Sequence, residues 1–475
     1  MTSVDDRQDR FNLFRAYDIR GEFGKDLDPQ FYAEVGMAAC KVVGQDLGRP
    51  PTVYVGYDVR MTSPALAYAL VAGMASVGAK VIFAGEPFPF GVVLFSGLAE
   101  QVDFTAFVTA SHLPPHWNGC KFYYGDGVGV PEEKIQAIRD RYLQGGFTQE
   151  VAAQPWDQIF PIPQTHHRDA YYQFLQDKFA LPRPLRVVLD CGNGSASLTA
   201  VKIFERCGYT VQPLWCDVDP SFPNRPSEPN PETLVELSKR VVAEQADFGV
   251  GFDGDGDRAV IVDDTGAVLA ADSIAVLLAR YLTQPSGQSV ATPQVLANIE
   301  CSTLLEANLA DTCEVVRIKV GHTFLTLEAR NRRGQCVLGV ESSGHFVFPN
   351  LFLFDDSMPL PLYVGLMLTS SNEKLSELVA RLPRMEVFRK VVPASDDSKF
   401  KVIEALVTDW QPRYPQLNTI DGLAIPFEGD GYLLIRASNT GPKIRVFAEA
   451  KSKERLDEIT EEFVPQLEKK IHDLS

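Results

Sequence analysis

The sequence predicts an α/β protein with three topologically similar α/β domains followed by a C-terminal α+β domain. A strand–helix–strand pattern begins at Val53 and recurs at Val187 and at Val295. Each unit has a short apolar strand, a polar turn, a helix and a second strand, as in βαβ folds. Residues 383–475 instead contain two alternating strands and a long charged helix, which is typical of an α+β domain.

The first strands of the three units begin 134 and 108 residues apart, which is too far for a solenoid and suits separate domains. At roughly 100–200 residues per domain, 475 residues correspond to about three or four domains. We therefore predict domain boundaries at 1–162, 163–270, 271–382 and 383–475.

The elements that support this division are short. We predict unit strands at 53–57, 77–85, 187–189, 207–215, 295–299 and 313–319, and their helices at 65–75, 198–206 and 304–310. Further strands are expected at 104–108, 246–250, 431–438 and 443–450, and the final helix at 452–474. Proline-rich stretches at 154–164 and 220–231 are expected to be connections or ordered loops.

The chain is acidic, with 62 acidic and 45 basic residues and a net charge of −17. This charge argues against nucleic acid and against an anionic membrane surface as partners. A protein of this charge that binds phosphate must concentrate its lysines and arginines locally.

The eight cysteines are scattered without a C-x-x-C pair, so neither a disulfide framework nor a zinc site is expected. Residues 1–8 are polar and acidic, unlike a signal peptide, and no run of 18 apolar residues suggests a membrane span. The expectation is a reduced, cytoplasmic compartment.

The segment Gly251–Arg258 (GFDGDGDR) follows a predicted strand and places Asp253, Asp255 and Asp257 at alternate positions. Mg²⁺ prefers several oxygen ligands in an octahedron, and the glycines allow three carboxylates to face one point. A polar turn is the alternative, but three carboxylates this close repel one another unless a cation compensates. The loop is predicted to bind metal.

Ser111 lies in Thr109-Ala-Ser-His, directly after the strand predicted at 104–108, and Lys121 follows in Asn118-Gly-Cys-Lys. A serine beside a base or a metal can be a nucleophile or a phosphate carrier, although a serine at such a position is, taken alone, most often a turn or capping residue. The G-x-S-x-G pattern of a hydrolase is absent here.

Two later loops carry polar groups suited to a sugar phosphate. Gly339–His345 (GVESSGH) offers a carboxylate, hydroxyls and an imidazole that could bind sugar hydroxyls. Arg436–Arg445 (RASNTGPKIR) combines arginines, hydroxyls and a glycine-containing turn, which could bind an anion. Polar loops or ordinary β-turns are the simpler interpretations.

Two shorter motifs, FRAYDIRG at 14–21 with Arg15 and Arg20, and Lys319-Val-Gly-His322, mean little alone. The remaining histidines are expected at the surface; they are His116, His166, His167 and His472.

Taken together, these motifs resemble the α-D-phosphohexomutase superfamily, in its phosphomannomutase/phosphoglucomutase branch. The resemblance covers nearly the whole chain, and FRAYDIRG, TASHLPPHWNGCK, GFDGDGDR, KVGHT with GVESSGH, and RASNTGP occur in the family's order. It implies the family's four-domain architecture, in which the first three domains are alike.

The resemblance also implies roles for individual residues. Ser111 would carry the phosphoryl group, and a phosphoserine oxygen would bind Mg²⁺ together with Asp253, Asp255 and Asp257. Of the other catalytic residues, Arg20 and Lys121 would be the candidates for proton transfer and charge stabilisation, and His322 and His345 would line the same site. The substrate-binding residues would be Arg258, Glu341, Ser343, Arg436, Ser438, Asn439 and Thr440.

The implied reaction is reversible phosphoryl transfer between C1 and C6 of mannose or glucose phosphate, through phosphoserine and a hexose 1,6-bisphosphate that also acts as activator. Partners would be small-molecule hexose phosphates, and the protein a monomer or homodimer. Phosphoglucosamine mutase and strict phosphoglucomutase are alternatives; a silent sugar-phosphate-binding protein or a metal-dependent phosphatase would leave several motifs unexplained.

The sequence departs from the family pattern at two positions. Leu113 replaces the usual asparagine after Ser-His, and Asn298-Ile-Glu300-Cys-Ser aligns with a segment that supplies a substrate-binding lysine in bacterial members. A carboxylate at Glu300 would repel a phosphate, so we expect that contact to be lost or supplied by Lys319.

Overall fold

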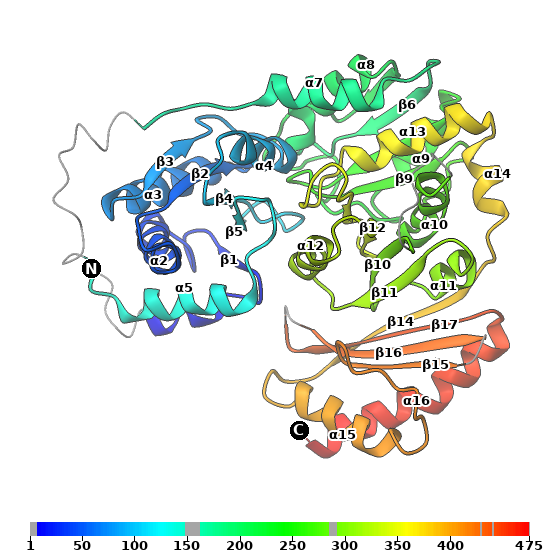
Figure 1. Ribbon diagram of the computed structural model, residues 1–475. Coiled ribbons are helices and arrows are strands. Elements are labelled where there is room, and N and C mark those ends of the chain that lie inside the picture. Colours follow the sequence, from blue (N-terminus) through cyan, green and yellow to red (C-terminus); the bar gives the residue numbers. More distant parts are fainter. Residues whose placement is uncertain (1–6, 148–161, 285–291, 428–429, 439–440, 475) are drawn as a thin grey trace.

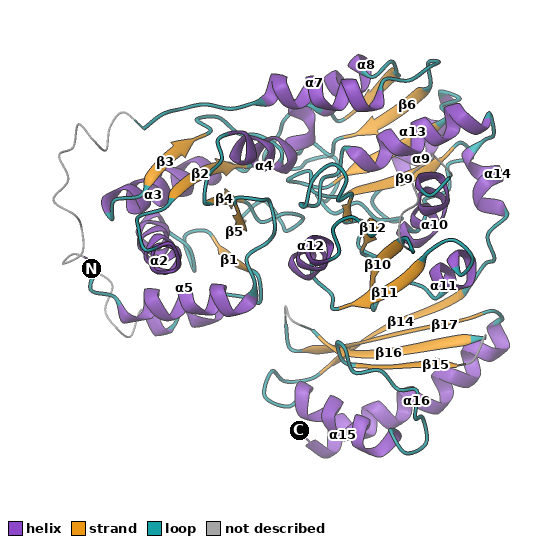
Figure 2. Ribbon diagram, viewed as in Figure 1, coloured by secondary structure: helices purple, strands orange, loops and turns teal. Residues whose placement is uncertain are grey.

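The computed structural model describes residues 7–147, 162–284, 292–427, 430–438 and 441–474, which form four sheets with their covering helices (Figure 1). Helices lie on both faces of the first three sheets, and α15 and α16 cover one face of the fourth (Figure 2). Part of the proline-rich stretch at 154–164 lies outside the described residues.

The first sheet has the strand order β1-β5-β4-β2-β3. Its strands are β1 (Asp18–Glu22), β2 (Thr52–Tyr57), β3 (Lys80–Phe83), β4 (Phe104–Val108) and β5 (Trp117–Tyr124). Its helices are η1 (Phe11–Leu13), α2 (Pro29–Leu47), α3 (Ser63–Ser76), α4 (Phe90–Ala99) and α5 (Glu132–Gln144). Strand β2 is parallel to β3 and β4, whereas β5 is antiparallel to β4 and β1.

The second sheet has the order β7-β6-β8-β9. It contains β6 (Arg186–Asp190), β7 (Thr210–Leu214), β8 (Phe248–Phe252) and β9 (Ala259–Asp263). Its helices are α7 (Arg168–Phe179), η3 (Ser195–Leu198), α8 (Ala200–Arg206) and α9 (Val235–Ala243). The helix predicted at 198–206 is thus a 3₁₀ turn followed by a shorter α-helix, because Thr199 has a non-helical φ of −140°.

The third sheet repeats this order as β11-β10-β12-β13. It contains β10 (Gln294–Asn298), β11 (Glu314–Ile318), β12 (Cys336–Val340) and β13 (Phe346–Val347). Its helices are α10 (Ala271–Leu282), α11 (Leu304–Leu309), α12 (His322–Asn331), α13 (Pro359–Ser371) and α14 (Leu375–Ala380). In each of the three sheets, the first central strand (β2, β6 or β10) pairs in parallel with a second (β4, β8 or β12), and the strand that follows the second pairs with it antiparallel. This common pattern confirms the predicted similarity.

The fourth sheet is antiparallel, with the order β14-β17-β16-β15. Its elements are β14 (Glu386–Pro393), α15 (Lys399–Trp410), β15 (Leu423–Phe427), β16 (Gly431–Ala437), β17 (Lys443–Ala450) and α16 (Lys453–Leu474). This arrangement confirms the predicted α+β domain. The proposed residue boundaries of the four domains stay a prediction.

Local sequence signals explain where the elements begin and end. Helix α2 starts with Pro29 after Asp28, whose carboxylate accepts the backbone N–H of Phe31 at 2.8 Å. Such an N-cap contributes about 1 kcal/mol. The helix ends at Gly48, which adopts the left-handed conformation with φ +67°.

One apolar core runs through the first three domains and includes buried Tyr54, Leu189 and Val295 from their three central strands. The C-terminal domain has its own core between its sheet and α15 and α16. A small apolar cluster joins it to the third domain, together with polar contacts such as the hydrogen bonds from the Tyr432 hydroxyl to the Ile299 carbonyl at 2.9 Å and from the Thr303 hydroxyl to Glu449 at 2.6 Å. One apolar cluster therefore spans the first three domains, which also contain further clusters of their own, whereas the fourth domain has a separate core.

The expectation of no disulfide is wrong, because Cys191 and Cys216 are bonded, with their Cα atoms 4.9 Å apart. Cys191 directly follows β6 and Cys216 lies just beyond β7, and these parallel strands pair Asp190 with Leu214. Strand pairing therefore brings the two cysteines together, which their 25-residue separation in sequence did not reveal. The other six cysteines are free and buried.

Among the helices within the described ranges, none combines the length and apolar character needed to cross a membrane.

Candidate active site

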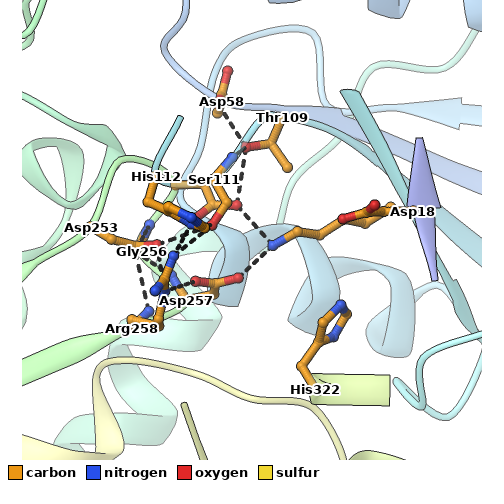
Figure 3. A network of polar contacts seen from close by, with 12 residues as sticks. Asp18, Asp58, Thr109, Ser111, His112, Asp253, Gly256, Asp257, Arg258 and His322 are labelled. Atoms are coloured by element: carbon orange, nitrogen blue, oxygen red, sulfur yellow. Dashed lines mark hydrogen bonds and ion pairs between the residues drawn. The ribbon is translucent and has the colours of Figure 1, made fainter. Parts of the chain in front are cut away.

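The phosphoserine candidate lies at the carboxyl end of β4, at the centre of a polar network (Figure 3). Ser111 is buried and has a φ of +53°, a left-handed conformation that is unusual for a residue with a Cβ. Its hydroxyl lies 3.2 Å from a carboxylate oxygen of Asp253, 3.4 Å from a guanidinium nitrogen of Arg258 and 3.3 Å from Nδ1 of His112. The serine oxygen therefore lies between an acidic and a basic group.

The predicted metal loop lies directly opposite Ser111, after β8. Oxygens of Asp253, Asp255 and Asp257 all lie within 4.8 Å of one another, and all three side chains are buried. One oxygen each of Asp255 and Asp257 has no hydrogen-bond partner among the described residues. Such orphaned buried carboxylate oxygens fit a hard divalent cation.

Two glycines allow this loop to approach the serine. Gly256 has a φ of +76°, and a Cβ at Gly254 would lie 2.6 Å from the backbone carbonyl oxygen of Ser111. The loop then folds back so that one oxygen of Asp253 accepts backbone N–H groups of residues 256–258 at 3.0–3.2 Å. The repeated glycines thus serve close packing of the two loops.

Lys121 from β5 is the main positive charge beside the carboxylates. Its ammonium lies 2.5 Å from Asp257 and 3.1 Å from Asp255. Burial alone would lower the pKa of Lys121, but Asp255 and Asp257 outweigh this effect and raise it. Burial would likewise raise the pKa of Asp257, but the attraction of Lys121 lowers it well below its usual range. Burial and repulsion from Asp257 raise the pKa of Asp253.

Two histidines from the third domain face this region and share one carboxylate. His345 Nδ1 lies 2.6 Å from Asp355, and His322 Nδ1 lies 3.9 Å from the other oxygen of Asp355. Burial lowers the pKa of His322 to about 4, so this imidazole is neutral near pH 7. Burial also opposes the charged form of His345, but Asp257 and Asp355 outweigh it and raise its pKa.

The loop after β12 positions the predicted sugar-binding carboxylate. One oxygen of Glu341 accepts the backbone N–H of Gly321 at 2.7 Å and the amide of Asn298 at 3.1 Å. Burial raises the pKa of Glu341, with the nearby His345 and the Gly321 N–H acting in the opposite direction. The carboxylate thus fixes the adjacent loop before His322 while its other oxygen remains available.

Arg436, at the end of β16, is the predicted phosphate-binding arginine. Its guanidinium lies 2.8 Å from Asp421 and 3.2 Å from Glu300, the unusual glutamate. Ser438 is buried nearby, whereas Asn439 and Thr440 lie outside the described residues. Lys319 is exposed, with its ammonium over the ring of Phe324, and does not line the cavity described below.

Arg20, from β1, points into the same region and is held by Asp18, with 2.7 Å between the two groups. Tyr17 lies beside them, and its ring packs edge-on against His322. Burial, together with the charge of Asp18, raises the pKa of Tyr17 to about 12, so its phenol remains protonated.

A cavity of about 440 Å³ opens in front of Ser111 and is bordered by all four domains. Ten of the predicted site residues line it, namely Arg20, Ser111, Lys121, Arg258, His322, Glu341, Ser343, His345, Arg436 and Ser438. The three aspartates of the metal loop lie beneath the serine. The volume suits one hexose with its phosphates.

Comparison with known proteins accounts for nearly the whole chain. Residues 12–149, 169–266 and 270–385 match the alpha/beta/alpha domains I, II and III of phosphoglucomutase/phosphomannomutase, and residues 388–466 match its C-terminal domain. The chain belongs to this family. The predicted family and its four-domain architecture are confirmed, and with them the assignment to the phosphohexomutases, which are isomerases.

Individual relatives agree with this assignment. A phosphomannomutase/phosphoglucomutase of Pseudomonas aeruginosa is 31% identical over 461 residues, which cover 96% of this chain and 95% of the relative. A probable phosphoglucosamine mutase of Methanopyrus kandleri is also 31% identical, over 454 residues, with 94% and 95% coverage. A solved phosphoglucomutase/phosphomannomutase family structure from Burkholderia thailandensis has a TM-score of 0.84 at 28% identity, with 97% and 98% coverage.

The structure adds residues to the site that the motifs did not single out. Asp355 joins the two histidines, Asp18 holds Arg20, and His112 contacts both Ser111 and Arg258. Asp18 and His112 lie inside the motifs quoted from the sequence, so a position near the site could be expected for both. Asp355 was not, because nothing in LFLFDDS distinguishes a buried acid from an ordinary loop residue.

The two departures have structural counterparts. The backbone carbonyl of Leu113 accepts a hydrogen bond from Arg60 at 2.7 Å, so this loop is held without the usual asparagine side chain. Glu300 forms an ion pair with Arg436 and therefore neutralises a guanidinium that is predicted to bind phosphate. The loss of a substrate contact at Glu300 stays a prediction. The structure adds an ion pair between Glu300 and Arg436, which would compete with a substrate phosphate.

Proposed function

We propose that this phosphohexomutase interconverts the 1-phosphate and 6-phosphate of mannose or glucose through phosphoserine 111. The observation that carries the proposal is the buried Ser111 hydroxyl between Asp253 and Arg258, which faces a cavity bordered by basic side chains. Phosphoryl transfer depends mainly on positioning and on charge neutralisation, and both are available here.

The metal we propose is Mg²⁺, held by Asp253, Asp255, Asp257 and an oxygen of phosphoserine 111. When bound, it would neutralise charge on the transferring phosphoryl group. The orphaned oxygens of Asp255 and Asp257 support this assignment. Arg258, whose guanidinium approaches the serine oxygen, would stabilise the same charge from the other side.

In the first half-reaction the phosphorus–oxygen bond of phosphoserine breaks and a bond to a sugar hydroxyl oxygen forms. That hydroxyl must lose a proton, and the serine oxygen is left as an alkoxide that must be neutralised. We assign proton transfer to His345, with Lys121 and Arg20 stabilising the developing charge and neutral His322 orienting the sugar. Asp355 supports the assignment of His345 because its carboxylate lies 2.6 Å from Nδ1, as an ion-pair partner, and leaves Nε2 available.

The product of this step is a hexose 1,6-bisphosphate. We propose that Arg436, Ser438, Asn439 and Thr440 bind the phosphate that does not react, while Glu341 and Ser343 bind sugar hydroxyls. The bisphosphate must then reverse its orientation, so that its other phosphate returns to Ser111. A C-terminal domain with a core of its own would suit the movement that this reversal requires.

A coupled assay of the purified protein with Mg²⁺ tests the proposal. Mannose 1-phosphate, glucose 1-phosphate and glucosamine 1-phosphate would be offered separately, with and without trace glucose 1,6-bisphosphate. We expect 6-phosphates of mannose or glucose to form, with stimulation by the bisphosphate. Preferred conversion of the glucosamine ester would move the protein to phosphoglucosamine mutases, and release of free phosphate would identify a phosphatase.

The setting of the enzyme follows from the same proposal. Its partners would be soluble hexose phosphates, with no nucleic acid or membrane, and it would act in the cytoplasm as a monomer or homodimer. Sedimentation of the purified protein measures its oligomeric state directly.

A further inference from the structure

Each of the three similar domains has the same arrangement of hydrogen bonds at the end of its first central strand, and the sequence motifs did not reveal it. In each domain the first central strand ends at an aspartate or asparagine: Asp58 after β2, Asp190 in β6 and Asn298 in β10. In each, the side-chain Oδ1 accepts the backbone N–H two residues ahead, at 3.0, 2.8 and 3.1 Å. All three side chains are at least 98% buried.

Each of these residues lies next to a loop that carries part of the proposed chemistry. Strands β2, β6 and β10 pair in parallel with β4, β8 and β12. The phosphoserine loop follows β4, the metal loop follows β8 and the sugar loop follows β12. Because the carboxyl ends of parallel strands lie at one edge of a sheet, each residue is adjacent to the start of one loop.

In the first domain the remaining oxygen of Asp58 contacts the phosphoserine loop. It accepts the hydroxyl of Thr109 at 2.8 Å, and the same hydroxyl accepts the backbone N–H of Ser111 at 2.8 Å. Asp58 also binds the Nε of fully buried Arg60 at 3.0 Å. One terminal nitrogen of that guanidinium donates to the carbonyls of both Ser111 and Leu113, each at 2.7 Å.

In the second domain the carboxylate acts through an arginine from the proline-rich segment 220–231. Asp190 binds Nε of Arg225 at 2.9 and 3.0 Å. A terminal nitrogen of Arg225 donates to the carbonyl of Phe252 at 2.7 Å, and Phe252 directly precedes Asp253 of the metal loop. The contact therefore fixes the backbone from which the metal loop departs.

In the third domain Asn298 hydrogen-bonds to a carboxylate, whereas Asp58 and Asp190 bind donor groups. The Nδ2 group of Asn298 donates to Glu341 at 3.1 Å. An aspartate at this position would place a second negative charge against Glu341, whereas asparagine keeps the turn and supplies a donor. The residue type at each of the three positions thus matches the group it must hold.

We propose that Asp58, Asp190 and Asn298 are equivalent positioning residues, each of which holds one functional loop of its own domain. They touch no substrate, but act through Thr109 and Arg60, through Arg225, and through Glu341, respectively. The left-handed Ser111 supports the proposal, because such a conformation persists only where surrounding contacts fix it. The inference rests on the proposed function for the meaning of each loop.

The test uses exchanges of one atom for another: Asp58→Asn, Asp190→Asn and Asn298→Asp. The matched control is Asp263→Asn, at a buried aspartate that also ends a strand and accepts the N–H two residues ahead at 2.9 Å; within the described part of the chain, its side chain accepts hydrogen bonds only from its own turn. Asparagine can accept the same turn hydrogen bond, so the control should leave activity unchanged.

Three measurements distinguish the three loops. We expect Asp58→Asn to slow phosphorylation of Ser111 by glucose 1,6-bisphosphate about 100-fold. The reaction is monitored by mass spectrometry of the intact protein. Asp190→Asn should weaken Mn²⁺ binding by about 10- to 100-fold, measured by titration calorimetry on the dephosphorylated protein. Asn298→Asp should raise the KM for hexose phosphate by about tenfold or more, with kcat changed less.

Equal changes in all three measurements for every variant would overturn the proposal, as would the same losses in Asp263→Asn. If Asp58→Asn fails to fold, Thr109→Val removes the same contact from its other end, with Thr109→Ser as the control that retains the hydroxyl. Asn298→Ala should raise KM less than Asn298→Asp, because it adds no charge. A wild-type protein without mutase activity would refute the proposed function, whereas the Mn²⁺ affinities would still test the positioning of the metal loop.

Discussion

Glu300 is expected to compete with substrate for Arg436, and replacing it by glutamine should strengthen substrate binding. Its carboxylate lies 3.2 Å from the guanidinium of Arg436, which is also held by Asp421 at 2.8 Å. A phosphate that approaches Arg436 must displace Glu300 or accept its repulsion. Glutamine keeps the shape of the side chain and removes its charge.

The size of the effect follows from the exposure of the pair. The side chain of Glu300 is 14% exposed and that of Arg436 is 5% exposed. Two unit charges about 4 Å apart interact by roughly 4 kcal/mol at an effective dielectric constant of about 20. Most of this is offset by desolvation of the pair, and a hydrogen bond to a charged group contributes about 1.5–3 kcal/mol net. Glu300→Gln should therefore lower KM by about tenfold.

Steady-state assays with wild type and Glu300→Gln over a range of hexose phosphate concentrations measure this change. The control is Glu306→Gln, at a glutamate of the same domain that pairs with Arg317 at 2.6 Å but does not line the active-site cavity. KM should be unaffected in the control. An unchanged or higher KM in Glu300→Gln would refute the competition and show that Glu300 assists binding.

Other perturbations have equally definite outcomes. Asp253→Ala should reduce turnover with Mg²⁺ by about 1000-fold, since loss of a ligand removes several kcal/mol of charge stabilisation, and retained activity would contradict the metal assignment. Lys121→Met should lower the free energy of unfolding of the metal-free protein by about 3–5 kcal/mol, measured in urea, because Asp255 and Asp257 lose their buried partner; an unchanged midpoint would refute this pairing. His322, with its pKa lowered to about 4, stabilises the fold fully above pH 6.5 and progressively less as the pH falls toward 4, by about 3 kcal/mol in total. His322→Gln should lose less stability over that pH range, and identical losses in both proteins would show that another group titrates.

The sequence predicted the domain repeat, and ten of its candidate site residues line one cavity, because both depend on local patterns. The strand before each motif was an apolar run, and the motif itself began where that run ended, as at Val108 before Thr109 and at Phe252 before Asp253. A loop placed at the carboxyl end of a strand in an α/β sheet is a reliable location for a site. Pattern alone therefore indicated a metal-binding loop at the three aspartates, whereas the role of Ser111 came from the family resemblance, and both assignments stay predictions.

Contacts between distant segments could not be predicted in the same way. Lys121 and Asp257 are 136 residues apart and meet only because the first two domains pack together. No motif singled out Arg60 or Arg225, because the carbonyls that hold these buried guanidinium groups cannot be identified from the sequence. The pairing of Cys191 with Cys216 likewise depended on the register of two strands.

The charge distribution of the active-site cavity affects how substrate reaches it. Seven basic and three acidic side chains line the cavity, in a chain whose net charge is −17. An anionic sugar phosphate approaching from solution is therefore repelled at long range and attracted only near the entrance. Since the Debye length is about 10 Å at 0.1 M salt, ions screen the distant repulsion before they weaken the contacts inside. The rate of association should consequently rise with the first additions of salt, the reverse of the behaviour of an enzyme that attracts its substrate from a distance.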